Sequence, residues 1–198
     1  MKGVRSLFCL LGFALFTLNS CTEQNKEQIA SDKSTTEEVI DVMMSRRSIR
    51  AYKPEPVPHE IMDVILKCCI NAPNGMNRQP WEIRVVDNQE MLNAMTDLYL
   101  KDMDADDPRN PKKDPNFRNM FRNAPTVVFI AMKPGLCSQV DCGLLAGNMV
   151  NTAWAYGIGS CIQMAPKEFM NSEEARPYLE KLSFSEGYEF LMVIGFGY

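Results

Sequence analysis

The sequence predicts an α+β fold with one sheet covered by helices. Segments whose apolar residues recur at helical spacing are interspersed with short segments that alternate or run continuously apolar, as strands do. The two kinds of segment do not alternate strictly, and the sequence contains no internal repeat. About 165 residues follow the N-terminal region, which is enough for one domain and too few for two ordinary ones.

The N-terminal region has the features of an export signal. Lys2 and Arg5 precede an apolar run over residues 7–18, which suits a signal-peptide core and is short of the ~20 residues that cross a bilayer. The run ends in Leu18-Asn19-Ser20-Cys21, which is typical of a bacterial lipoprotein, so we expect Cys21 to carry lipid after removal of residues 1–20. An ordinary cleaved signal, with Cys21 uninvolved, is the alternative. Residues 21–34 are largely polar and predict a flexible tether before the domain at residues 35–198.

Composition excludes several kinds of partner. Residues 1–20 hold two of the 21 basic residues and none of the 25 acidic ones, so the remaining chain has a formal charge of −6 and no expected affinity for nucleic acid. A single histidine and the absence of Cys-x-x-Cys predict that no metal is bound. The cysteines form no recognisable disulfide pattern. Cys68 and Cys161 are expected in the core, and whether Cys137 pairs with Cys142 stays open.

In the first half of the domain, local signals define helix boundaries. Thr35 and Glu38 have the spacing of a capping box, and Pro73 disfavours the helical conformation of the residue before it. The predicted order is a helix over 35–46, an extended proline-rich segment over 52–58, a helix over 59–72, a turn at 74–75 and a strand over 81–86.

In the second half, a long helix ends at a glycine turn. Gly157 and Gly159 follow the apolar helix in the manner of a helix stop, and five Asp and three Pro predict a surface excursion over 102–115. The other predicted elements are a helix over 90–100, a strand over 126–132, the long helix over 141–156, a strand over 161–164, a helix over 177–182 and a strand over 190–194.

Residues 46–50, Arg-Arg-Ser-Ile-Arg, are the first candidate binding segment. Guanidinium groups and hydroxyls bind phosphate well, and here three guanidiniums and one hydroxyl fall within five residues. If the segment is extended, Arg46, Ser48 and Arg50 share one face. The alternative, which this stretch alone favours, is a solvated basic helix end that interacts with the helix dipole.

The second candidate binding segment is residues 72–81, Ala-Pro-Asn-Gly-Met-Asn-Arg-Gln-Pro-Trp. Backbone amides beside Gly75 and the side-chain amide of Asn77 suit the hydrogen-bonding edge of a flat ring such as isoalloxazine. A plain connection between a helix and a strand would use similar residues.

The two segments in this order, about twenty-five residues apart, resemble the nitroreductase family of FMN-dependent oxidoreductases. Residues 141–161 resemble the family's long central helix and glycine turn, and residues 193–198 resemble its last strand. The resemblance covers residues 37–198 and implies a central mixed sheet covered by helices. It also implies a homodimer with FMN between the subunits, in which the small residues Gly143, Ala146 and Gly147 allow close helix contact.

The resemblance also implies roles for single residues. Arg50 is expected to support negative charge on reduced flavin, and no side chain is expected to act as a catalytic base. Many relatives continue past the last strand with a basic tail, so with the end at Tyr198 we expect a weaker dimer and phosphate site. The expected flavin contacts are Arg46, Arg47, Ser48 and Arg50 for the phosphate, ribityl chain and pyrimidine edge, Pro73, Asn74, Gly75 and Asn77 from the partner subunit, and Gln163 and Met164 near flavin N5.

The implied activity passes electrons through flavin N5 to a small acceptor such as a nitroaromatic compound or a quinone, with NAD(P)H as the usual donor. Export and anchoring to a membrane would separate the enzyme from NAD(P)H, so we expect a quinol or a redox protein as donor. A cytoplasmic enzyme that uses NAD(P)H is the alternative. Two other functions stay open: dehydrogenation of a small metabolite, or binding of flavin or a partner by a surface lipoprotein without turnover.

Overall fold

The computed structural model describes residues 35–198, so the predicted signal, tether and Cys21 lie outside the described residues. Residues 35–45 are helical, and the chain up to Met44 belongs to a different compact unit from Ser45–Tyr198. Four apolar residues of this helix are exposed to solvent: Val39, Ile40, Met43 and Met44.

Four antiparallel strands form one sheet, in the order β1-β2-β4-β3. Their bounds are Trp81–Val86 for β1, Thr126–Met132 for β2, Gly159–Gln163 for β3 and Glu189–Gly197 for β4. Every residue of β2 is buried, as expected for a central strand. The one parallel pairing among the described residues is an isolated bridge between Ser48 and Ser160, so the expected mixed character of the sheet is confined to that bridge.

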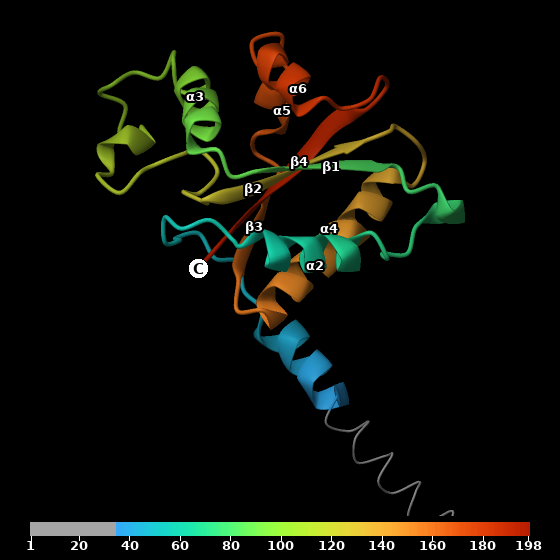
Figure 1. The fold of residues 1–198 in the computed structure, drawn as a ribbon. Helices are drawn as coiled ribbons and strands as arrows, with labels where there is room; N and C mark the ends of the chain where they lie inside the picture. Colours follow the sequence, from blue (N-terminus) through green and yellow to red (C-terminus); the bar gives the residue numbers. More distant parts are fainter. Residues whose placement is uncertain (1–34) are drawn as a thin grey trace, which may run out of the picture. The chain divides into compact units, whose positions relative to one another are not determined.

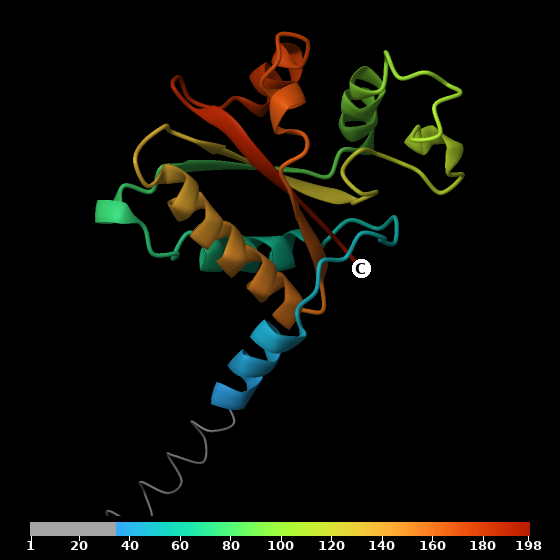
Figure 2. The same ribbon diagram turned by 180° about the vertical axis from the view of Figure 1, so that it is seen from behind.

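Helices cover both faces of the sheet (Figure 1). On one face lie α2 (His59–Cys69) and α4 (Ser138–Ala155), and on the other lie α3 (Gln89–Tyr99), α5 (Lys167–Met170) and α6 (Arg176–Leu182), as the reverse view also shows (Figure 2). Each face has its own apolar core, because alternate strand residues point to opposite sides. The predicted α+β class and helix-covered sheet are confirmed.

A glycine-dependent cap ends α4 and sets the direction of β3. The amide of Gly157 donates to the carbonyl of Trp154, and the amide of Ile158 donates to the carbonyl of Ala153, both over 2.9 Å. This pair of bonds is a Schellman motif, and Gly157 has the positive φ of 69° that the motif requires. Because Ile158 is fully buried, the chain turns from α4 directly into β3.

Several predicted boundaries and environments were wrong. The predicted helix over 59–72 ends earlier, because α2 stops at Cys69, and the long helix starts three residues earlier, at Ser138. Cys68 is exposed, and its neighbour Cys69 is the buried one, whereas Cys161 is buried as predicted. Cys137 and Cys142 are both free thiols.

The excursion after α3 is anchored by polar contacts. It contains one short 3₁₀ helix, Pro111–Lys113, whose first turn is capped by the buried side chain of Asn110. Arg118 Nη2 donates to the carbonyl of Tyr52 over 2.6 Å and to that of Asn123 over 2.8 Å, which ties the excursion to the start of the domain. Within residues 35–198, no helix has the length and apolarity needed to cross a membrane.

Candidate functional site

The arginine segment, residues 46–50, lies along the outer edge of β3. The indole Nε1 of Trp154 donates to Ser45 Oγ over 2.8 Å, and the amide of Ile49 donates to the carbonyl of Ser160 over 2.9 Å. Gly159 permits this approach, since a Cβ at that position would lie 2.9 Å from the Ile49 side chain. The segment is therefore held in an extended conformation at the point where α4 turns into β3.

Alternation along this segment separates its apolar and polar side chains. Ile49 is half-buried and packs against the core under α3, whereas Ser48 and Arg50 on either side of it are exposed. This pattern fits the predicted shared face of Arg46, Ser48 and Arg50.

Two arginines of the segment, Arg46 and Arg50, form no ion pair with any residue that the structure describes. Arg46 is half-buried, and its guanidinium makes no hydrogen bond or ion pair with any residue that the structure describes. Among the described residues, the Arg50 guanidinium makes only a 3.5 Å contact with the carbonyl of Ser48, and Arg47 Nη1 donates to the carbonyl of Arg46 over 2.8 Å. A half-buried guanidinium without a carboxylate partner is suited to bind an anion from solution.

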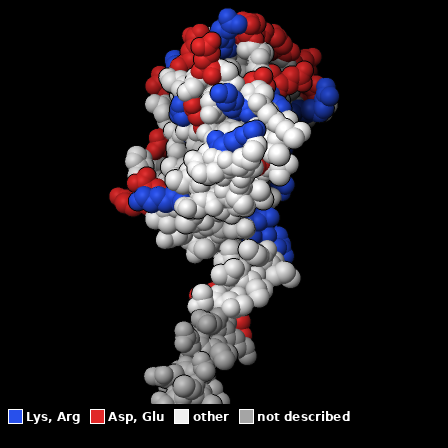
Figure 3. Space-filling view, turned by 90° about the vertical axis from the view of Figure 1, so that its right-hand side faces the viewer, with Lys and Arg blue, Asp and Glu red and all other residues white. Residues whose placement is uncertain are grey.

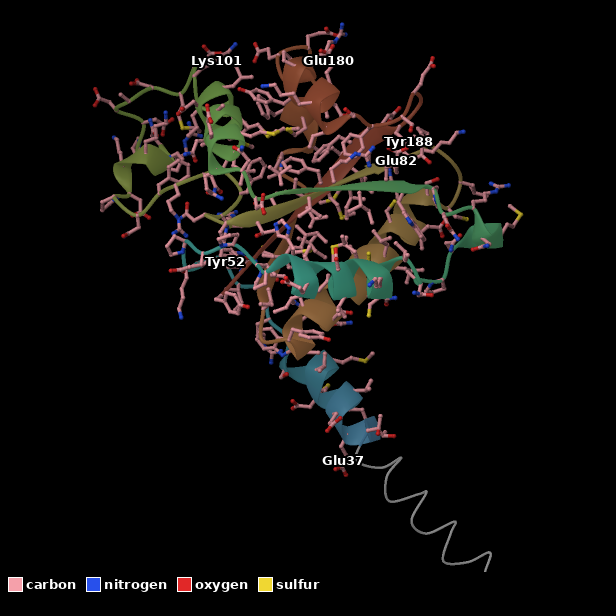
Figure 4. The ribbon with its side chains drawn as sticks, in the orientation of Figure 1. Glu37, Tyr52, Glu82, Lys101, Glu180 and Tyr188 are labelled. Carbon is pink, nitrogen blue, oxygen red and sulfur yellow. The ribbon has the colours of Figure 1, made fainter. Side chains whose placement is uncertain are left out.

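Tyr52 fixes the end of the segment. Its hydroxyl donates to the carbonyl of Ile49 and lies 3.3 Å from the carbonyl of Gly195, so it joins the segment to β4 (Figure 4). Burial, with a smaller contribution from the neighbouring Cys161, raises the pKa of this hydroxyl well above its usual value, and the charge of Arg50 acts in the opposite direction. Tyr52 is therefore a neutral structural donor at physiological pH.

Two buried polar groups of β3 lack partners. Within residues 35–198, Ser160 Oγ and Gln163 Nε2 are the only buried side-chain atoms without a hydrogen bond. Ser160 is the residue that bridges to Ser48, and Gln163 points inward toward Gly195, while Met164 is half exposed. Buried polar groups are normally paired, so these two atoms are exceptions, and both are covered by protein.

The second segment, residues 73–79, forms a strained loop. Three non-glycine residues, Met76, Asn77 and Gln79, adopt left-handed conformations with φ of 53°, 53° and 47°. Such conformations are costly for residues with a Cβ and persist only where surrounding contacts enforce them. Asn74 accepts a hydrogen bond from the amide of Gln79 over 2.9 Å, and the Gln79 side chain donates to Asn77 Oδ1 over 3.0 Å.

Asp141 connects this loop to α4, and its role was not predicted from the sequence. The amide of Gly75 donates to Asp141 Oδ1 over 3.0 Å, and Asp141 is buried in the first turn of the helix. The sequence offered one signal: an acidic residue near the start of an otherwise apolar helix.

The two segments lie at opposite ends of α4, as Figure 1 shows. Asp141 contacts the loop, and Trp154 contacts Ser45 thirteen residues further along the helix, a separation of ~20 Å at 1.5 Å per residue. One protomer therefore does not bring residues 46–50 and 73–79 together, and a site that uses both needs two chains.

The outer face of α4 is suited to contact another chain. Val140 and Leu144 are 65% and 42% exposed, and a Cβ added at Gly143 or Gly147 would meet nothing within 4 Å. Ala146, which was expected on this face, is instead buried in the core. In the view of Figure 3, charged side chains gather mainly over the α5–α6 end of the domain, and the surface below that end is largely uncharged.

The chain is similar to known proteins in both sequence and structure. Residues 43–198 match the family described as the nitroreductase family. A crystal structure of a nitroreductase with bound FMN from Bacteroides fragilis is similar over 81% of this chain and 88% of its own, with 26% identity and a TM-score of 0.71. A second nitroreductase with bound FMN, from Desulfitobacterium hafniense, matches over the same shares with 28% identity and a TM-score of 0.70. A protein from Archaeoglobus fulgidus, provisionally named NADH dehydrogenase/NAD(P)H nitroreductase, is 28% identical over 169 residues, which are 82% of this chain and 86% of that protein.

Proposed function

The chain belongs to the nitroreductase family, and on this premise we propose that it is an FMN-dependent oxidoreductase that delivers electrons to a small acceptor such as a nitroaromatic compound or a quinone. One observation carries the proposal to this chain's own residues. The side chain of the half-buried Arg46 has no partner among the described residues, and it lies on a segment that the bond from the Ile49 amide to the Ser160 carbonyl fixes to β3.

The residues present fit FMN. Arg46 and Ser48 offer a guanidinium and a hydroxyl to a phosphate or a ribityl chain, and no carboxylate among the described residues pairs with Arg46. Arg47 adjoins this group. At the end of β3, backbone groups of Gln163 and Met164 serve the flavin ring, because the Gln163 side chain is turned into the core. The relatives with 26% and 28% identity carry FMN in their crystals, which supports the assignment.

Bound FMN supplies the redox chemistry, since it accepts two electrons from a donor and passes them on. The protein binds and orients the cofactor and adjusts its electrostatic environment. Arg50 places a positive charge near the cofactor, and positive charge favours the electron-rich, reduced state. None of the described residues needs to act as a general base, because protons for the reduced product can come from water.

We propose that the active form is a homodimer joined through the exposed face of α4. Residues 46–50 and 73–79 are separated by about 20 Å along α4 in one protomer, so a second chain must supply one of them. Pro73, Asn74, Gly75 and Asn77 would then reach the flavin that is held by the arginines of the other subunit.

Which electron donor the enzyme uses depends on where the protein is located. We propose that residues 1–20 direct export and that Cys21 anchors the domain to a membrane through lipid, so that a quinol or a redox protein reduces the enzyme. The name of the Archaeoglobus fulgidus relative instead points to NAD(P)H. Cell fractionation of the wild type beside Cys21→Ser decides between them: export is supported if the wild type is in the membrane fraction and the variant is released, and a cytosolic wild type whose flavin NAD(P)H rapidly reduces contradicts it.

The main test is cofactor binding. The purified protein should take up FMN with visible flavin absorbance, which a reductant bleaches and an acceptor restores. A protein that remains colourless after incubation with FMN would disprove the proposed function, because the chemistry resides in the cofactor. If the protein binds FMN but no nitroaromatic or quinone acceptor reoxidises the reduced flavin, it is a flavin-binding protein without this activity.

A further inference from the structure

The loop at residues 73–79 depends on one hydrogen bond to the rest of the fold. Its other hydrogen bonds are internal to residues 72–81, including those from Asn74 to Ala72 and from Gln79 to Asn74. Among the hydrogen bonds of residues 73–79, only the bond from the Gly75 amide to Asp141 Oδ1, 3.0 Å long, reaches a described residue outside 72–81. The flanking Pro80 is bonded separately, because its carbonyl accepts from the Lys133 amide over 2.9 Å. Loop and helix are 66 residues apart in sequence, so this contact closes a long segment of chain.

The loop needs such an external contact because of its backbone. Three left-handed residues with side chains, Met76, Asn77 and Gln79, are disfavoured in isolation. Internal hydrogen bonds can hold a turn but do not fix its orientation relative to α4. The Asp141 carboxylate supplies that orientation, and Gly75 packs directly on the first turn of the helix, where its Cβ position lies 3.5 Å from Cys137.

The carboxylate of Asp141 is buried in the first turn of α4. Asp141 is 5% exposed, and it lies in the first turn of an 18-residue helix, where the helix dipole favours a negative charge. It accepts from a backbone amide and forms no ion pair with a described residue. Its charge is therefore not neutralised by a nearby cation and acts on whatever the loop contacts.

We infer that Asp141 is a positioning residue of the flavin site, holding residues 73–79 in the shape that contacts the cofactor of the partner subunit and placing a negative charge behind them. The inference rests on the proposed function, since the loop is assigned to the flavin through the family. It assigns two separable effects: the oxygen that accepts from Gly75 sets loop geometry, and the charge lowers the reduction potential of the bound flavin.

Two variants separate the effects. Asp141→Ala removes the acceptor and the charge, whereas Asp141→Asn keeps an acceptor oxygen and removes only the charge. Asp63→Asn, an exposed carboxylate on α2 without a hydrogen bond in the described structure, is the matched control for net charge. Three quantities are measured on the full chain: amide hydrogen exchange of the peptide covering residues 72–81 in the absence of FMN, the FMN dissociation constant, and the midpoint potential of the bound flavin.

With Asp141→Ala, exchange of the 72–81 peptide should be about tenfold faster and the FMN dissociation constant about tenfold higher, the scale of a lost hydrogen bond to a charged group. With Asp141→Asn, the dissociation constant should stay within about threefold of the wild type, while the potential becomes more positive. Asp63→Asn should change neither the FMN dissociation constant nor the midpoint potential.

The inference is overturned if Asp141→Ala leaves both exchange and FMN binding unchanged, or if Asp141→Asn loses as much affinity as Asp141→Ala. An unchanged potential in Asp141→Asn overturns the electrostatic part. If Asp141→Ala does not fold, the Asp141→Asn measurements still decide. A wild type that binds no FMN refutes the proposed function, and the exchange measurement then still tests the contact between loop and helix.

Discussion

The amide of Ile49 donates to the carbonyl of Ser160 over 2.9 Å, and this contact places the arginine segment on the edge of β3. Trp154 adds a second contact at Ser45, and Tyr52 a third at the carbonyl of Ile49. Three contacts within eight residues fix a segment in which the side chains of Arg46 and Arg50 form no ion pair with a described residue. Rigid backbone with uncompensated charge is an arrangement suited to an anionic ligand.

Replacing Arg46 with Ala should weaken FMN binding by about 1.5–3 kcal/mol, roughly 10- to 150-fold, because a charged hydrogen bond to the phosphate is lost. Arg176→Ala removes the same charge from α6 and should leave the dissociation constant unchanged. Equilibrium titration followed by flavin fluorescence measures both variants. Equal affinities for the wild type and Arg46→Ala would reject the role of Arg46.

Replacing Arg50 with Ala should lower the reduction potential of the bound flavin, because a positive charge near the ring stabilises the reduced, more negative cofactor. Arg50→Lys retains the charge and should fall between Arg50→Ala and the wild type. Midpoint potentials from a redox titration with a reference dye give the order. If Arg50→Ala has the potential of the wild type, Arg50 does not act on the ring.

Adding a methyl group at Gly159 should displace the arginine segment. A Cβ there would lie 2.9 Å from both Ile49 Cβ and Cγ1, so Gly159→Ala should reduce the free energy of unfolding by about 1–3 kcal/mol and weaken FMN binding. Ile49→Gly in the same chain removes both clashing atoms, so urea unfolding of the double variant should show a smaller loss than the sum of the single variants. Strict additivity would place the strain elsewhere.

Local signals in the sequence account for the elements but not for the contacts that build the site. Periodicity locates the strands and the helices, because burial of one face imposes it. The bridge from Ser48 to Ser160 and the bond from Gly75 to Asp141 join residues that are far apart in sequence and have no local signature. Ala146 illustrates a related error: small residues along α4 suggested one interface, yet only the helix orientation shows that Ala146 faces inward. The left-handed residues of the loop were also not predicted, since Met and Gln rarely adopt that conformation.

A charged residue on the outer face of α4 should prevent dimer formation. Gly147 has open space around its Cβ position, so Gly147→Arg should leave the protomer folded while burying an unpaired cation in the proposed interface. Light scattering should report a monomer at micromolar concentration, and FMN affinity should fall with it, because the two binding segments then belong to separate molecules. Glu180→Arg, on exposed α6, is the control and should remain dimeric. A dimeric Gly147→Arg with normal FMN binding would show that the interface lies elsewhere.

The unfolding free energy should fall as pH rises above about 9, because two thiols are buried. Burial raises the pKa of Cys69 from 9.0 to about 12, and burial together with the charge of Asp141 raises that of Cys142 to about 12. In the unfolded chain these thiols lose their protons near pH 9, whereas the folded chain retains them to about pH 12. Stability is therefore complete below about pH 9 and declines across that interval, since the folded state binds more protons.

Urea unfolding under reducing conditions between about pH 8 and about pH 11 measures this dependence. Cys142→Ala should reduce the slope of unfolding free energy against pH, even though the smaller side chain lowers stability at every pH. Cys137→Ala, which alters an exposed thiol, should keep the slope of the wild type. Tyr52 is shifted in the same direction and adds a decline above its ordinary value of 10.0 that all three proteins share. If Cys142→Ala and the wild type lose stability in parallel from pH 9 upward, the Cys142 thiol is not the group whose ionisation destabilises the fold.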